Sequence, residues 1–316
     1  MRVLCFGELL IDMVSPRPDA DLGVAREFIK APGGAPANVA VGLSRLGIAS
    51  SFLGSVGDDP FGHFLRDVVK QENVDVSGVK LSPNRTTIAF VATKTDGSKD
   101  IVFYRNPGAD ADFSVRDLPD LRDVSIFHCG SVSLSLDPCR SAQFEAARRV
   151  RSHGGLVSFD PNWRPSLWKD EKLAHKLIWQ MMGLSDVVKV ADEEWEFVTG
   201  TPNFEIGAAK IREIGPRLVL QTRGKNGAAF EFAGGRGEVA GREAQAIDTL
   251  GAGDAFVAGF LAEMARAGSL DGILNEEELS ESLRFANACG ALATQKAGAI
   301  PSLPSHGEVA AFLVQA

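Results

Sequence analysis

The sequence lacks the features that mark several classes of protein. Its four cysteines show no CxxC pair, which excludes a disulfide scaffold and favours isolated thiols in a reducing compartment. Its five histidines show no HxH or HxxxH spacing, which argues against a dedicated zinc site. No GxSxG sequence is present, so a nucleophilic serine of the hydrolase type is not indicated.

Excess positive charge and long apolar runs are also missing. The chain has 33 basic and 41 acidic residues, a net charge of −8, which argues against sequence-independent binding of nucleic acid. No apolar run approaches the length of a membrane span, and no cleavage-site pattern follows the first apolar run. We therefore expect a cytoplasmic protein that binds neither nucleic acid nor membranes.

What is present is enough apolar material for a full core, at 45% of 316 residues. Expected strands lie at 2–12, 50–56, 124–129, 156–160, 187–190, 217–221 and 228–232. Expected helices lie at 36–46, 60–72, 252–267 and 276–295. Apolar strands that alternate with helices predict an α/β fold, with a mostly parallel sheet covered on both faces.

Two segments break this alternation, at about 13–31 and 86–106. Residues 86–93 alternate in polarity and, after Asp96-Gly97, the pattern returns at 101–104, which predicts a hairpin. Together the two segments predict a small sheet beside the main one. Open α/β sheets bind ligands at the carboxyl ends of their strands, so we favour a lid there over a plain surface hairpin.

The stretch Asp248-Thr-Leu-Gly-Ala-Gly-Asp254 leads into apolar positions with helical spacing. Gly251 and Gly253 therefore fall at a helix N-terminus, where bare amides and the helix dipole form an anion site. Asp254 either stabilises this helix end or acts on a substrate. The stretch is neither a Walker A loop nor a Rossmann fingerprint. A phosphate site with an aspartate and no lysine favours a hydroxyl as the nucleophile.

A second glycine pair, Gly33-Gly34, also precedes a helix and lets the backbone approach a ligand closely. Asn38, in the first turn of that helix, can hydrogen-bond a polyol or cap the turn locally. Asp12, placed at the end of the first predicted strand, can accept hydrogen bonds from vicinal hydroxyls or cap a loop.

Three segments, GGAPANVAVGLSRLG, GSVGDDPFG and DTLGAGDAFVAGF, resemble the two signatures of the ribokinase-like (PfkB) carbohydrate kinases, in that family's order. Within the family, GELLIDMV, FYRNPGADA and FDPNWRPSLW are most similar to fructokinases. The resemblance implies a single ribokinase-like domain over residues 1–316, with the small sheet as its lid. It also implies transfer of the γ-phosphoryl group of ATP to a sugar hydroxyl, with D-fructose giving D-fructose 6-phosphate.

The resemblance also implies roles for individual residues. Asp254 would accept the hydroxyl proton, while the amides of Gly251, Ala252 and Gly253 would form the anion hole. The sugar would contact Asp12, Gly33, Gly34, Asn38, Phe90, Phe103, Arg105, Arg164 and Asp254. Without the resemblance, the two arginines would be read as surface residues, and the two phenylalanines fit ordinary sheet packing equally well.

For the nucleotide side, the resemblance implies contacts from Lys189, Thr222, Gly224, Gly227, Ala252, Gly253 and Asn287. The family's NxxE motif, linked to Mg²⁺ and phosphate, falls at 191–194, where Glu194 fits but Ala191 replaces the asparagine. A monovalent cation, K⁺, would lie near Asp248. Relatives often form homodimers through the lid sheet.

Alternatives within the family remain open. 2-Keto-3-deoxygluconate kinases share the arginine that stands at position 164, but typically carry tyrosines where this chain has Phe90 and Phe103. A nucleoside kinase is a weaker match. An inactive sugar-binding relative would be expected to lose the aspartate or glycines of the GAGD segment, and both are intact here.

Overall fold

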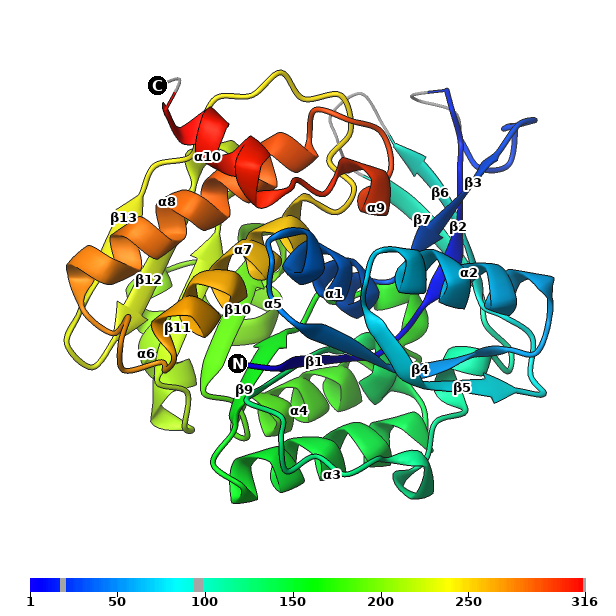
Figure 1. The fold of residues 1–316 in the computed structure, drawn as a ribbon, viewed down its shortest axis with the longest axis horizontal. Coiled ribbons are helices and arrows are strands. Elements are labelled where there is room, and N and C mark those ends of the chain that lie inside the picture. Colours follow the sequence, from blue (N-terminus) through cyan, green and yellow to red (C-terminus); the bar gives the residue numbers. More distant parts are fainter. Residues whose placement is uncertain (18–20, 94–98, 315–316) are drawn as a thin grey trace.

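A nine-stranded sheet forms the centre of the molecule (Figure 1). The computed structural model describes residues 1–17, 21–93 and 99–314. The strand order is β13-β12-β11-β10-β9-β8-β1-β4-β5. The bounds are β1 (Val3–Phe6), β4 (Ser50–Gly57), β5 (Asp75–Ser82), β8 (Ile126–Gly130), β9 (Leu156–Asp160), β10 (Val187–Ala191), β11 (Leu218–Thr222), β12 (Ala228–Phe232) and β13 (Gly235–Val239). All neighbours pair in parallel except β11–β12 and β12–β13, which confirms the mostly parallel sheet.

Helices cover both faces of this sheet, as predicted. One core contains residues of α1 (Ala35–Arg45), α2 (Pro60–Gln71), α7 (Ala252–Ala267), α8 (Glu276–Ala293), α9 (Ala299–Ser302) and α10 (His306–Val314). The other contains residues of α3 (Cys139–Ser152), α4 (Glu171–Met182), α5 (Asp192–Thr199) and α6 (Phe204–Glu213). In Figure 1 the sheet lies between α7 and α8 above and α3 and α4 below. Side chains of β1 enter the two cores alternately, because successive residues of a strand point to opposite faces.

Short 3₁₀ turns complete the connections. They are η1 (Ala109–Ala111), η2 (Val115–Asp117), η3 (Val132–Ser135), η4 (Pro165–Leu167) and η5 (Gly224–Asn226). None of the helices in the described part of the chain combines the length and apolar content needed to cross a bilayer.

A separate four-stranded sheet, here called the small sheet, has the order β3-β2-β6-β7. Its strands are β2 (Leu10–Val14), β3 (Ile29–Gly33), β6 (Ile88–Thr93) and β7 (Lys99–Tyr104). The antiparallel pair β6–β7 confirms the predicted hairpin. β2 pairs with β3 in antiparallel and with β6 in parallel, so both segments join one mixed sheet. The predicted Asp96-Gly97 turn lies outside the described residues.

The single strand predicted over 2–12 is wrong, because the chain changes sheet within it. β1 ends at Phe6, and β2 begins at Leu10 in the small sheet. Gly7 lies between them with φ +156°, and a Cβ there would stand 2.6 Å from Pro36 Cγ. Because the apolar residues continue from β1 into β2, the sequence pattern did not indicate the break between the two strands. Asp12 therefore lies inside β2 and not at the end of the first strand.

Two strands of the large sheet were not predicted. β5 (DVSGVKLS) and β13 (GRGEV) are the edge strands of the sheet and are largely not buried. Because one side of an edge strand faces solvent, these sequences carry few apolar residues and give no strand pattern.

Candidate active site

The two glycine-rich turns predicted as ligand sites meet in space. Asp254 lies in the first turn of α7 and Asn38 in the first turn of α1, 216 positions apart in the sequence. Both side chains are buried, and Asn38 Nδ2 donates a hydrogen bond of 2.7 Å to Asp254 Oδ2. Asn38 Oδ1 is also buried and has no protein partner. An acceptor and a carboxylate therefore converge at the start of two helices.

The first turn of α7 is open to an anion. Gly251 precedes the helix in the left-handed region, with φ +82°, and no side chain caps the helix. A Cβ at Gly251 would approach Ala299 to 3.0 Å, so a larger residue is disfavoured by both its backbone and its neighbours. The uncapped amides and the positive end of the helix dipole make this turn a site for negative charge.

Asp254 is chemically suited to accept a proton. Burial raises its pKa to about 6, against the hydrogen bond from Asn38, which lowers it. The charge of Asp160 raises the pKa further, and those of Lys189 and Arg164 lower it. A carboxylate with this pKa is mostly ionised at neutral pH and is more basic than an exposed aspartate.

A lysine does stand at this anion site, which corrects the expectation of a phosphate site without one. Lys189 in β10 is buried, and its Nζ lies 3.0 Å from Asp160 Oδ2. A Cβ built on Gly253 would lie 3.6 Å from the same Nζ. Burial lowers the pKa of Lys189, but the surrounding carboxylates raise it above its ordinary value, so the charge persists. The 248–254 stretch alone could not show it, because Lys189 is distant along the chain; only the family resemblance had named Lys189, as a nucleotide contact.

Gly33 and Gly34 are required by their surroundings. A Cβ at Gly33 would stand 2.0 Å from Asp12 Oδ2, so the glycine makes room for that buried carboxylate. Gly34 has φ +114°, and a Cβ there would stand 2.3 Å from the carbonyl oxygen of Glu8. The structure thus brings Asp12 beside the turn that begins α1.

Glu8 belongs to this region and was missed by the sequence reasoning. Its Oε1 accepts a hydrogen bond of 3.0 Å from the amide of Ala35, the first residue of α1. The N-cap of this helix is Gly34, which has no side chain to make such a bond. Its Oε2 is buried without a partner, and burial raises the pKa of Glu8 to about 7. The sequence signal for a buried carboxylate was the position of Glu8 beside the apolar residues of GELLI.

The two predicted sugar-binding arginines differ in their surroundings. The side chain of Arg105 is 3% exposed, with Nη2 2.7 Å from Asp110 Oδ2 and Nη1 donating to Ser135 Oγ at 2.6 Å. Its charge is therefore paired inside the protein. Arg164 is half-buried after β9, and its charge lowers the pKa of Asp254. Arg164 therefore lies within electrostatic range of Asp254.

The two predicted lid phenylalanines lie on opposite faces of the small sheet. Strand register pairs Ala89 with both Asp12 and Phe103, so Phe103 shares a face with Asp12. Phe90 pairs with Val102 on the other face, where its ring packs against Phe28 and Tyr104 with centroids 4.9 and 5.4 Å away. The expectation that both rings cover one sugar is corrected, because the strand register places the two side chains on opposite faces of the small sheet.

The predicted nucleotide-side residues gather where β11 ends. Thr222 is its last residue, and Gly224 and Gly227 flank η5 before β12. Gly227 has φ +92°, and a Cβ there would stand 2.0 Å from Val239 O. Asn287 of α8 donates from Nδ2 to Val239 O and Ala240 O at 3.3 and 3.2 Å. The amide of Asn287 therefore fixes the chain after β13, and a nucleotide contact from it stays a prediction.

The two predicted metal-side carboxylates are bound to backbone amides. Asp248 Oδ1 accepts from Leu250 N and Oδ2 from Gly298 N, both at 2.9 Å. Glu194 Oε1 accepts from Ala191 N and Glu194 Oε2 from Trp163 N. Within the described ranges, no group of three or more His, Cys, Asp or Glu side chains is arranged to hold a metal ion. A divalent ion here would therefore depend on nucleotide phosphates and water for most of its ligands.

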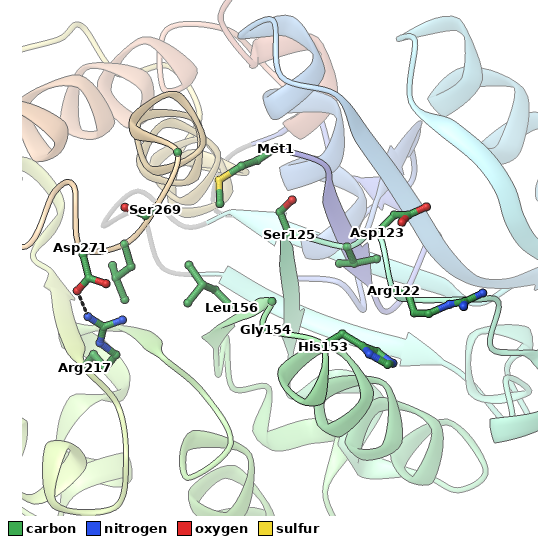
Figure 2. A pocket seen from close by; sticks show the side chains of 14 residues that line it. Met1, Arg122, Asp123, Ser125, His153, Gly154, Leu156, Arg217, Ser269 and Asp271 are labelled. Atoms are coloured by element: carbon green, nitrogen blue, oxygen red, sulfur yellow. Dashed lines mark hydrogen bonds and ion pairs between the residues drawn. The ribbon is translucent and has the colours of Figure 1, made fainter.

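A surface cavity of about 440 Å³ lies at the opposite end of the large sheet (Figure 2). It is lined by Ser125, Leu156 and Arg217, which stand at the amino ends of β8, β9 and β11. Arg217 pairs there with Asp271. Open α/β sheets bind their ligands at the carboxyl ends of strands, so this cavity is separate from the candidate active site.

The family model described as pfkB family carbohydrate kinase matches residues 1–306. Probable fructokinase-7 of Arabidopsis thaliana is 42% identical, over 97% of this chain and 91% of its own length. Fructokinase-2 of Oryza sativa subsp. japonica is 43% identical, over 96% of this chain and 91% of its own.

Solved structures agree. Fructokinase from Vibrio cholerae O395, in its fructose, ADP and calcium ion bound form, superposes with a TM-score of 0.90 and 36% identity, covering 99% of this chain and 98% of that one. Aminoimidazole riboside kinase from Salmonella enterica gives a TM-score of 0.88 with 32% identity, covering 99% of this chain and 100% of that one.

Fold and site together define a kinase that acts on small alcohols. The chain belongs to the pfkB family of carbohydrate kinases.

Proposed function

We propose that this protein is an ATP-dependent fructokinase that converts D-fructose to D-fructose 6-phosphate. The buried Asn38–Asp254 pair at the uncapped start of α7 carries this proposal, because it joins a base to an anion site. Similarity to fructokinases over nearly the whole chain favours fructose. The relative from Vibrio cholerae, described with fructose and ADP bound, supports the same sugar and nucleotide.

In the proposed reaction, the 6-hydroxyl oxygen forms a bond to the γ-phosphorus, and the bond to the β-phosphate oxygen breaks to release ADP. Asp254 takes the hydroxyl proton. The amides of Gly251, Ala252 and Gly253, with Lys189, stabilise the migrating group. Asn38 holds the Asp254 carboxylate in place, so much of the rate comes from alignment of the hydroxyl with the phosphate.

The sugar would lie between the small sheet and the starts of α1 and α7. In this proposal Asp12, Gly33, Gly34 and Asn38 contact its hydroxyls, and the small sheet closes over it as a lid. Of the two predicted aromatic contacts, Phe103 is retained because it shares a face with Asp12.

The buried Arg105–Asp110 ion pair favours an uncharged sugar over a sugar acid. With Arg105 paired to Asp110, Lys189 and Arg164 are the cations that act on Asp254. A carboxylate substrate would have to compete for them with the transferred phosphate. We therefore expect 2-keto-3-deoxygluconate to be a poorer substrate than fructose.

On the nucleotide side, Thr222, Gly224, Gly227 and Asn287 would line the ATP site. Mg²⁺ would arrive with ATP and supply positive charge to its phosphates. K⁺ would lie near Asp248, whose carboxylate ties the loop before α7 to Gly298.

We also propose a cytoplasmic homodimer formed through the small sheet. All four cysteines are free thiols, in keeping with a reducing compartment. On the face of the small sheet that carries Phe90, Val102 and Tyr104 are 44% and 67% exposed. A second copy of the chain would cover this apolar surface.

The test is an ADP-release assay with Mg-ATP and a panel of fructose, glucose, ribose, 2-keto-3-deoxygluconate and adenosine. Fructose should give the highest kcat/KM. A higher value for the sugar acid or for adenosine would replace the proposed substrate while leaving the kinase class intact.

Asp254→Asn should lower turnover with fructose by roughly 10²–10⁴-fold, because the positioned base is lost while the side chain keeps its shape. ATP affinity, measured by calorimetry, should change little. Near-normal turnover in this variant would remove Asp254 from the mechanism.

A further inference from the structure

The turn that carries Arg164 follows β9 and has an unusual backbone. It contains Asn162 at φ +42°, in the left-handed region, which asparagine adopts more readily than other residues with a Cβ. Arg164 comes two residues later, and its Nη1 donates to Trp163 O at 3.1 Å. The direction of the arginine therefore depends on what fixes the turn.

One support comes from the large sheet. Asp160 Oδ1 accepts a hydrogen bond of 3.1 Å from the amide of Asn162, and Asp160 Oδ2 pairs with Lys189 Nζ at 3.0 Å. A single carboxylate thus holds the start of the turn and the cation that stands beside α7.

The second support comes from α5. Glu194 Oε2 accepts a hydrogen bond of 2.7 Å from the amide of Trp163. The Trp163 ring stacks on Phe197, with the centroids 3.5 Å apart and the planes at 5°. Glu194 and Phe197 are three residues apart, so they share one face of the helix. This face therefore holds both the backbone and the ring of the residue that precedes Arg164.

We propose that Glu194 is a positioning residue for the sugar site: it fixes Trp163 and thereby aims Arg164 at the bound sugar. The inference rests on the proposed function, in which Arg164 binds the sugar. It differs from the family expectation of a Mg²⁺ role, because the other oxygen, Oε1, accepts from Ala191 N at 3.1 Å. Both oxygens of the carboxylate are therefore engaged by the backbone.

The chain itself points the same way. Ala191 stands where the family motif has an asparagine, so the side chain that would accompany Glu194 toward a metal is missing. Ala191 contributes its amide to Glu194, which joins the end of β10 to the turn after β9. Glu194 thus connects two parallel strands of the large sheet across their carboxyl ends.

The decisive variant is Glu194→Gln, because an amide can accept only one of the two backbone hydrogen bonds. Fructose affinity is measured by calorimetry without nucleotide and in the presence of EDTA. We expect the Kd for fructose to rise about tenfold, with a loss of hydrogen bonding to a charged group as the cause. The Kd for Mg-ATP should stay within about twofold. The neighbouring exposed Glu193→Gln makes the same charge change and should leave both values at the wild-type level.

A double-mutant cycle separates positioning from an independent effect. If Glu194 acts through Arg164, Glu194→Gln should add less than about twofold to the fructose KM of Arg164→Ala. If the rise in fructose KM of the double variant equals the product of the two single-variant rises, the proposal is overturned. An unchanged fructose Kd in EDTA, especially with a raised Mg²⁺ requirement, would also overturn it.

Thermal unfolding checks that each variant is folded. Should Glu194→Gln unfold, Phe197→Leu removes the stacked ring instead, and the same rise in fructose Kd is expected. A wild-type fructose affinity in that variant would contradict the proposal. Wild-type turnover with fructose is measured first, so failure of the fructokinase proposal is seen separately. If fructose is not turned over, the panel sugar with the highest turnover replaces it. The ratio of variant Kd to wild-type Kd is then interpreted in the same way.

Discussion

At the scale of single residues, burial sets the chemistry of Asp254, and the amide of Asn38 moderates it. Activity should fall about tenfold per pH unit below about pH 6, as Asp254 becomes protonated. Asn38→Ala removes a hydrogen bond to the ionised carboxylate, so the pKa should rise and this acid limb should move to higher pH. The measurement is kcat/KM against pH for both proteins. An acid limb that stays in place would show that Asn38 does not tune Asp254.

Glu8 carries a different pH dependence, which concerns stability. Burial raises its pKa from an ordinary value of 4.5 to about 7, so between these values the folded state binds more protons than the unfolded state. Stability from this group is therefore present at low pH and is lost as pH rises through about 7. Glu8→Gln should remove a penalty of about 3 kcal/mol at pH 8 and have little effect below about pH 5.

Urea unfolding of wild type and variant at these two pH values measures the difference. Glu27→Gln, at an exposed carboxylate, should change stability little at either pH. An equal effect of Glu8→Gln at both values would contradict the prediction.

The sequence predicted some site residues and missed others for physical reasons. Gly33, Gly34, Asn38 and Asp254 could be predicted as site residues because glycines before a helix leave a local pattern. Glu8 was missed because the amide that it binds lies 27 positions away. Partners that meet only through the fold leave no local spacing to detect.

At the scale of elements, the hairpin β6–β7 is the part of the molecule most suited to close over a sugar. Adding fructose should protect the amides of β6 and β7 from hydrogen exchange, because closure would reduce their opening. Helix α3, on the far face of the large sheet, serves as the internal control and should exchange as before. Equal exchange of the hairpin with and without fructose would make it an ordinary surface feature.

The bounds of β9, β12 and α7 were predicted as the structure has them, since each is a strongly patterned buried segment. The face assignment of Phe90 was not predictable. It depends on strand register, and a shift of one residue exchanges the two faces of a strand. Nothing within the hairpin sequence specifies which register the neighbouring β2 imposes.

At the scale of the whole molecule, the alternation of strands and helices was sufficient to predict the class of fold. It did not predict the strand order, in which β1 lies between β8 and β4, because pairings between distant segments are set by packing. The hairpin of the small sheet was predicted from its alternating polarity and its Asp96-Gly97 turn signal, since alternation of period two differs from the continuous apolar runs of buried parallel strands.

The proposed dimer gives a prediction at this scale. Tyr104→Glu would place a charge in the apolar face of the small sheet and should weaken association, observed by sedimentation as a shift from dimer to monomer. Val115→Glu, a charge at an exposed apolar residue in η2, is the matched control and should not change the assembly. A monomeric wild type, or a Tyr104→Glu protein that remains dimeric, would exclude this interface.

The passage from the large sheet to the small one takes only residues 7–9, between the end of β1 and the start of β2. Within it, Glu8 is bonded to the first residue of α1, and its carbonyl oxygen faces Gly34. Any rotation of the small sheet as a body must strain these few peptide units. Movement of the proposed lid is consequently coupled to the start of α1, where Asn38 meets Asp254.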